Sequence, residues 1–153
     1  MAIEKGITAK LEDWIASGLS ALEYDGSAVF SNAKPWEHQY PVGPESLKNK
    51  GRIAIVRYEP TNAAREGDYN LRDILEFSVA IVVSVPSKGI NRRGNSKHLG
   101  ASKIRDLVID NLDGSHPGDG FNCDELYYVG EANSSDTPEY YLTYLFFRIN
   151  QMR

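Results

Sequence analysis

The strongest pattern in the chain is a strict alternation of apolar residues along residues 75–85. A period of two over this length predicts a β-strand, because an α-helix repeats every 3.6 residues. The strand would cover residues 72–85, which is longer than the roughly 3–10 residues usual for a strand. We therefore expect it either to bend at a bulge or to project beyond the domain and pair with another surface. One side would carry Leu75, Phe77, Val79, Ile81, Val83 and Val85, and the other Ile74, Glu76, Ser78, Ala80, Val82 and Ser84.

Two segments have the apolar period of an amphipathic helix. Residues Ala2–Leu22 place their apolar side chains in one sector of a helix, with charged residues over much of the rest. Residues Leu99–Leu112 predict a second helix, with Asn95 or Ser96 as its N-cap and Gly114 just after its end. The inner face of this second helix would consist of Ala101, Ile104, Leu107, Val108 and Leu112.

Shorter segments complete the predicted sheet. They are residues 28–30, Arg52–Tyr58, Leu126–Glu131 and Tyr140–Asn150, with a polar turn over residues 132–138. The last strand carries large apolar groups on both faces. The order of elements predicts an α+β fold, in which a mostly antiparallel sheet of four to five strands has two helices packed on one face. We expect residues 1–153 to form a single domain.

Charge and composition argue against several classes of protein: those that bind nucleic acid or membranes, span a bilayer, form internal disulfides or are secreted. The formal net charge is −4, so no overall positive field draws the chain to nucleic acid or to an anionic membrane. Its single cysteine cannot form an internal disulfide. No apolar run approaches the roughly 20 residues that span a bilayer, and the first residues lack the apolar core of a secretory signal. We expect a soluble protein of a reducing compartment with no membrane partner.

Metal-binding and catalytic motifs are absent from the sequence. The three histidines lie in separate segments, at His38, His98 and His116. They have no metal-ligand spacing, and no glycine-rich nucleotide-binding motif is present. Cys123 is expected to be a small, partly buried side chain rather than a nucleophile. We expect no catalytic residue, no metal and no cofactor.

One loop keeps an enzymatic alternative open. The segment from Asp113 to Glu125 is rich in glycine and carboxylates, but it lacks the alternating spacing of a calcium loop. The favoured interpretation is a flexible connection between a helix and a strand. The remote alternative is a small metal-dependent hydrolase using Asp113, His116, Asp119 and Asp124.

Charges are unevenly distributed along the chain. The loop over residues 87–98 carries Lys88, Arg92, Arg93 and Lys97 and no acidic residue. From Asp106 to Glu139 there are acidic residues but no lysine or arginine. The basic loop either contacts phosphate or an acidic protein surface, or is a solvated turn beside a sheet edge. A chain with a basic and an acidic part can associate head to tail with copies of itself.

The pattern as a whole resembles a known family. The elements that carry the resemblance are the amphipathic N-terminal helix, the strand Arg52–Tyr58, the long strand opening with Leu71–Val79, the basic loop, the helix Ile104–Val108 and the aromatic strand Tyr140–Phe147. Together they are similar to the tail-terminator, or tail-completion, proteins of tailed bacteriophages, particularly the Mu-like, contractile-tail type also found in prophages. The resemblance covers nearly the whole chain apart from Ser27–Lys50.

The resemblance implies a structural role in the virion and no catalytic residue. Such proteins form a ring, commonly hexameric, on the head-proximal end of the tail tube, after assembly in the host cytoplasm. The implied partners are copies of the chain itself, the tail tube protein, the tail sheath protein and the head-completion or connector protein, with DNA only as passing cargo. An alternative is another ring or neck protein of the particle, or a tube-like protein of a contractile injection system.

Two sets of residues are predicted to make the assembly contacts. The first is the basic loop with Lys88, Arg92, Arg93 and Lys97, which would contact another subunit, the tube or the DNA channel. The second is the other face of the long strand, with Glu76, Ser78, Ala80, Val82 and Ser84.

Overall fold

The computed structural model describes residues 3–37, 51–60, 72–84, 90–137 and 139–152. Its elements in chain order are α1 (Ile7–Ser20), β1 (Glu23–Tyr24), β2 (Ser27–Ala28), β3 (Asn32–Pro35), β4 (Gly51–Glu59), β5 (Arg72–Ser84), α3 (Ala101–Leu112), the 3-10 helix η1 (Asp119–Phe121), β6 (Tyr127–Asp136) and β7 (Tyr141–Met152). No helix in these ranges is both long and apolar enough to cross a membrane.

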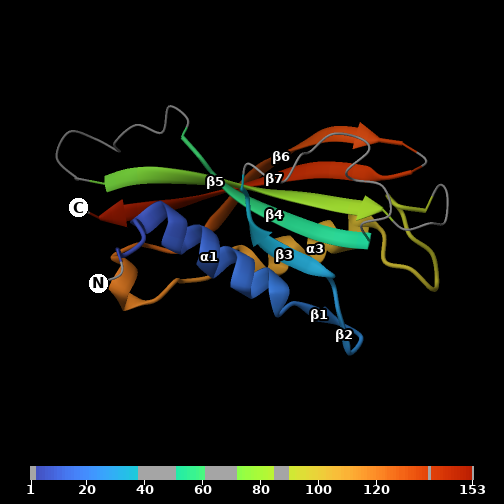
Figure 1. The fold of residues 1–153 in the computed structure, drawn as a ribbon, viewed down its shortest axis with the longest axis horizontal. Helices are drawn as coiled ribbons and strands as arrows, with labels where there is room; N and C mark the ends of the chain where they lie inside the picture. Colours follow the sequence, from blue (N-terminus) through green and yellow to red (C-terminus); the bar gives the residue numbers. More distant parts are fainter. Residues whose placement is uncertain (1–2, 38–50, 61–71, 85–89, 138, 153) are drawn as a thin grey trace.

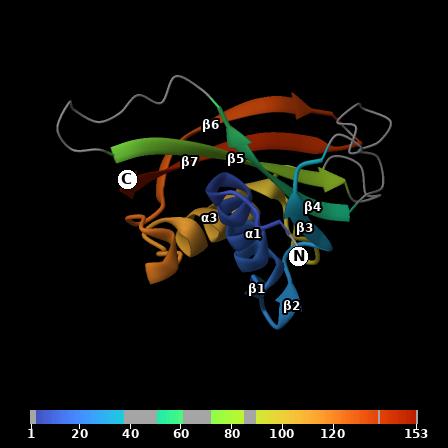
Figure 2. The same ribbon diagram turned by 60° about the vertical axis from the view of Figure 1, so that its left-hand side comes forward.

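The main sheet has five strands in the order β3-β4-β5-β7-β6. All neighbours are antiparallel except β3, which runs parallel to β4. Figures 1 and 2 show both helices, α1 and α3, on the same face of this sheet. The predicted α+β class is confirmed, and the parallel edge strand makes the sheet mixed.

The main core lies between the helices and this face of the sheet. The alternation along β5 points Leu75, Phe77, Val79, Ile81 and Val83 into it. The helices contribute Leu11, Ile15, Ala16 and Leu19 from α1, and Ala101, Ile104, Val108 and Leu112 from α3. Each large apolar side chain buried in this way stabilises the fold by about 1.5–3 kcal/mol, so the two helices are held firmly on the sheet.

Strand β5 is paired along its whole length. It pairs with β7 from Arg72 to Val83 and with β4 from Glu76 to Ser84, without a register shift. The expectation of a bulge in this strand, or of an unpaired projection, was therefore wrong, because β7 is long enough to match it. The bulges lie instead between β6 and β7, in the steps from Tyr128 to Gly130 and from Asn133 to Ser135.

The opposite face of the sheet carries a second, smaller apolar cluster. Its buried members are Ile55, Ala80, Val82, Tyr140 and Leu142, with Trp36, Ile53 and Tyr144 half-buried beside them. No helix of the described ranges lies on this face (Figure 2). The prediction that the last strand is apolar on both faces is confirmed.

Several predicted boundaries were wrong. Helix α1 begins at Ile7 rather than Ala2, with Gly6 as its N-cap. Helix α3 begins at Ala101, and its N-cap is Gly100, which has no side chain to cap with. Asn95 instead closes its own turn, because its Oδ1 accepts from the main-chain amides two and three residues later.

The remaining differences come from strand pairing. Strand β6 continues to Asp136, where a polar turn was expected, because pairing with β7 outweighs the polar composition of residues 132–136. Beyond β6, the main-chain amide of Thr137 donates to the carbonyl of Tyr140 over 2.9 Å. The expected strand over residues 28–30 is a two-residue strand followed by two buried apolar residues.

Candidate functional site

The described part of the basic loop, residues 90–98, is a closed structure rather than a loose connection. Gly94 forms an isolated antiparallel bridge with Leu99, and its main chain lies directly against Gly100. A Cβ atom added at Gly100 would lie 2.2 Å from the nitrogen of Gly94, which is far inside van der Waals contact. Gly94 also has a φ of 72°, in the left-handed region that glycine adopts without strain. Both glycines are therefore required for the loop to close.

Main-chain hydrogen bonds fasten this loop to the start of α3. The first amides of the helix, at Ala101 and Ser102, donate to the carbonyls of Asn91 and Arg92, each over 2.8 Å. These amides have no partner inside a helix, so the loop carbonyls take the place of a side-chain cap. The backbone that carries the cations of the loop is thereby held against the start of the helix.

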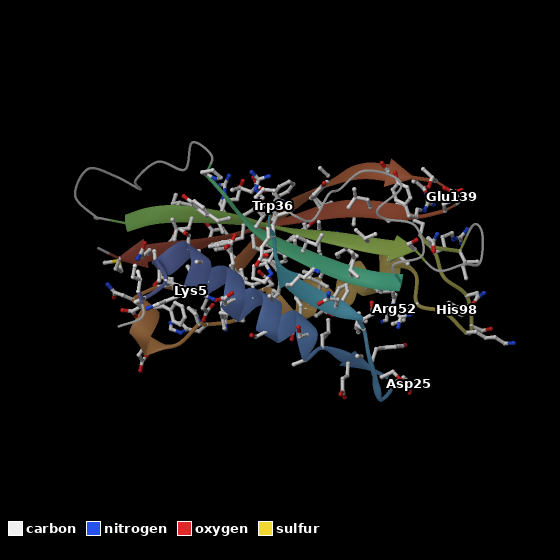
Figure 3. The ribbon with its side chains drawn as sticks, viewed as in Figure 1. Lys5, Asp25, Trp36, Arg52, His98 and Glu139 are labelled. Carbon is white, nitrogen blue, oxygen red and sulfur yellow. The ribbon has the colours of Figure 1, made fainter. Side chains whose placement is uncertain are left out.

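A groove lies between this loop and the β1–β2 hairpin. It has a volume of about 560 Å³ and is lined by residues of four segments: Tyr24, Asp25, Ser27, Arg52, Arg93, Asn95, Ser96, Lys97, His98, Leu99, Gly100 and Lys103. Figure 3 shows Asp25, Arg52 and His98 at the same end of the molecule. We call it the basic groove, after its four permanently charged cations Arg52, Arg93, Lys97 and Lys103.

Two of these cations are oriented by neighbouring groups. The Nε of Arg52 donates to the carbonyl of Val29 over 2.7 Å, so its guanidinium is tied to the chain that follows the hairpin. The Nζ of Lys103 lies 5.4 Å from the centre of the Tyr24 ring, a cation–π contact. The side chains of Arg93 and Lys97 are exposed. Among the lining residues that the structure describes, Asp25 is the only carboxylate. The groove therefore has an excess of positive charge and favours an anionic group.

The structure separates the neighbours Arg92 and Arg93. The Nη1 of Arg92 lies 3.7 Å from Oδ2 of Asp136, in an exposed ion pair with the end of β6. Arg92 lines a different hollow from the basic groove. Lys88 lies outside the described residues. Of the three predicted cations of this loop that the structure describes, Arg93 and Lys97 line the groove, together with Arg52 and Lys103.

The second predicted set of contact residues lies on the sheet face that carries the smaller cluster, and Ala80 and Val82 belong to that cluster. Four of its members have little exposed surface: Ser78, Ala80, Val82 and Ser84 are between 0% and 5% exposed. The fifth, Glu76, accepts a hydrogen bond of 2.9 Å from Nε of its cross-strand partner Arg148. A role of these residues in assembly stays a prediction, and any contact there would chiefly involve the half-buried residues around them.

Arg105 is a centre of charge pairing that the sequence did not indicate. Its guanidinium donates to Glu131 of β6 over 2.8 Å and to Asp106 over 2.8 Å, and it lies over the ring of Tyr128. These partners raise the pKa of Arg105 and lower the pKa of Glu131. The pair joins α3 to the edge strand β6 across 26 positions of sequence, a separation that local spacing does not reveal.

The acidic loop, residues 113–125, is at the other end of α3. Asp113, His116, Asp124 and Glu125 line an open depression of about 600 Å³ there. Oδ1 of Asp113 accepts from the amide of Tyr128, and Nδ1 of His116 accepts from the amide of Gly118, each over 2.9 Å. Within the described ranges, no group of three or more His, Cys, Asp or Glu side chains could hold a metal ion.

The single cysteine and two of the histidines remain to be placed. Cys123 is 7% exposed, which confirms the predicted burial. Burial raises the pKa of its thiol, and its Sγ donates to the carbonyl of Phe121. A raised pKa keeps the thiol protonated and therefore weakly reactive. His98 is exposed at the basic groove, and His38 lies outside the described residues.

No family model matches the chain, and no curated protein matches it.

Proposed function

We propose that this chain is a ring-forming structural protein of a phage tail, of the kind represented by the tail terminators. It would cap the head-proximal end of the tail tube, stop tube polymerisation, and offer surfaces to the sheath protein and the head connector. DNA would pass through the ring as cargo, and the ring would be hexameric.

The observation that supports this proposal is the separation of charge along α3. The basic groove lies at the N-terminal end of the helix, and the acidic loop follows its C-terminal end. Figure 1 shows the loop before α3 and the segment after it at opposite ends of the molecule. A molecule with complementary ends joins copies of itself by heterologous contacts, which close into a ring when the rotation allows.

The second apolar cluster gives further support. Half-buried aromatic side chains, Trp36 and Tyr144, border the sheet face that none of the described helices covers. Aromatic residues are enriched in the centres of protein interfaces. A second surface of this kind would allow a ring subunit to contact the tube or the sheath as well as its neighbours.

The test is electron microscopy of tails assembled without this protein. A tail terminator predicts overlong tubes, because nothing stops polymerisation. Tails of normal length without heads would instead support the alternative, a neck or head-completion protein. Tails of normal length that join heads would contradict both assignments.

A further inference from the structure

We propose that the basic groove binds the acidic loop of a second copy of this chain. The inference rests on the proposed function, since it specifies the contact between neighbouring subunits of the ring. The groove supplies Arg52, Arg93, Lys97 and Lys103, and the loop supplies exposed carboxylates, among them Asp119 and Glu125.

The groove is preorganised for an anionic partner. The backbone that carries Arg93 and Lys97 is held in two ways. Gly94 lies against Gly100, and main-chain hydrogen bonds join the loop to the first turn of α3. Arg52 and Lys103 face the loop from β4 and α3, and Arg52 is held by the carbonyl of Val29. A backbone that is already ordered loses little conformational freedom on binding, so more of the electrostatic attraction is retained as affinity.

The acidic loop is also firmly attached. Cys123 forms a β-bridge with Gln151, and the amide of Asp124 donates to the carbonyl of Asn150 over 2.9 Å. At the base of the loop, the amide of Gly114 donates to the carbonyl of Leu126 over 2.7 Å. The carboxylates of this loop are therefore presented from a fixed backbone beside the end of β7.

Within one chain the two surfaces cannot meet. They are separated by the length of α3, a helix of 12 residues, which corresponds to about 18 Å at 1.5 Å per residue. Figure 1 shows the loop preceding α3 and the segment following it at opposite ends of the ribbon. Contact between groove and acidic loop therefore requires two molecules, arranged head to tail.

A second copy fits the groove better than nucleic acid does. The chain has a net charge of −4 and nine acidic residues between Asp106 and Glu139, without lysine or arginine among them. A long polyanion would meet repulsion outside the groove, whereas a compact acidic loop places its charge only at the cations. The loop also has the negative end of α3 behind it, and the groove has the positive end.

Charge reversal tests the contact in solution. The first variant, R93E/K97E, reverses the groove, and the second, D119K/E125K, reverses the acidic loop. Sedimentation at an ionic strength near 0.01 M, where the Debye length is about 30 Å, should show self-association of the wild-type chain. In each variant we expect the dissociation constant to rise at least tenfold. A mixture of the two variants should regain association between unlike molecules, because the first variant keeps its acidic loop and the second keeps its groove.

The matched control is R92E. Arg92 precedes Arg93 directly but pairs with Asp136 of its own chain and does not line the groove. It should leave self-association within about twofold of the wild type. The comparison is with the single variant R93E, which makes the same change of charge one position later. An equal loss in R92E and R93E would contradict the groove and indicate a nonspecific effect of charge.

Zero-length carbodiimide crosslinking identifies the contact directly. In purified tails, Lys97 or Lys103 should be linked to Asp119 or Glu125 of another subunit, and mixed isotope labels should show the link to be intermolecular. If the tails contain the protein but no such link forms, this inference fails while the proposed function stands. If purified tails lack the protein, the proposed function fails.

Two solution results overturn the inference by themselves. The first is a wild-type chain that remains monomeric at low ionic strength up to millimolar concentration. The second is binding of a short duplex DNA that is lost in R93E/K97E, without any self-association of the wild type. That outcome would assign the groove to phosphate groups.

Discussion

The carboxylate of Glu12, on α1, accepts a hydrogen bond from the main-chain amide of Tyr58, with 2.7 Å between Oε2 and the nitrogen. Strand β3 pairs with β4 only as far as Val56, so this amide lies on the edge of β4 just beyond the last β3 partner. A helix side chain thus satisfies a strand amide where the neighbouring strand ends. The contact ties α1 to the sheet by a polar bond in addition to apolar packing.

Removing this carboxylate should destabilise the fold. In Glu12→Ala the amide of Tyr58 loses its partner, and leaving a partly buried donor unsatisfied costs about 1–3 kcal/mol. The free energy of unfolding, measured by urea denaturation, should fall by that amount. Glu12→Gln keeps an oxygen acceptor of the same shape and should lose less. Equal losses in the two variants would show that the hydrogen bond is unimportant.

The same residue should give the stability a defined pH dependence. Burial raises the pKa of Glu12 above its ordinary value of 4.5, although the bond from Tyr58 opposes the shift. The folded state therefore holds the proton more tightly than the unfolded state. This contribution is complete below about pH 4.5 and is lost as the pH rises through the raised pKa. The stability of wild type relative to Glu12→Gln should decrease over that window in urea titrations, and a constant difference would contradict the shift.

The Arg105–Glu131 pair should have the opposite pH dependence. The hydrogen bond that Glu131 accepts from Arg105 lowers the pKa of Glu131. The stabilisation is therefore present above the ordinary pKa of a glutamate and is lost as the pH falls through the lowered pKa. Both side chains are 35% exposed, so solvent screening limits the effect to about 1 kcal/mol or less. Glu131→Gln should unfold at a lower urea concentration than wild type near pH 6.5. The two midpoints should converge in acid.

A side chain should not be tolerated at Gly100, where the main chain of the basic loop lies against Gly94. In Gly100→Ala the new Cβ would meet main-chain atoms of Gly94 and Arg93 within 2.3 Å, and forced overpacking costs about 1–3 kcal/mol. We expect a lower melting temperature together with weaker self-association. The control for the melting temperature is Gly120→Ala in the acidic loop, where an added Cβ has nothing within 4 Å. A neutral Gly100→Ala would mean that the loop closes in another way.

Divalent metals should not stabilise the chain. Asp113 and His116 already accept main-chain hydrogen bonds, and the described ranges contain no group of three possible ligands. Melting curves with magnesium, calcium or manganese should therefore match those of the metal-free protein. A rise that disappears in Asp119→Asn and Asp124→Asn would instead favour the hydrolase alternative.

The periodic segments were predictable from sequence because their pattern reflects burial. The alternation from Leu75 to Val83 correctly separated the two faces of β5, and the spacing of Ile104, Val108 and Leu112 correctly identified the inner face of α3. In both cases a single regular backbone decides which side chains share a surface, so local spacing is sufficient.

Features that depend on distant residues were not predictable. Strand β3 is four residues long and is defined by its pairing with β4, about twenty positions later. The start of α3 is set by loop carbonyls rather than by a capping side chain. The basic groove combines a predicted loop with Arg52 and Lys103, and nothing in their local sequence indicates that they face it.

The closed backbone of the basic loop separates its shape from its charge. Gly94 and Gly100 determine the shape through their main-chain atoms alone. The charge toward the groove resides on Arg93 and Lys97, whose exposed side chains take no part in the contact between the two glycines. Substitutions at Arg93 and Lys97 can therefore alter what the loop recognises without altering how it folds. Related proteins with the same backbone would then bind different partners through a few side-chain replacements, without loss of the fold.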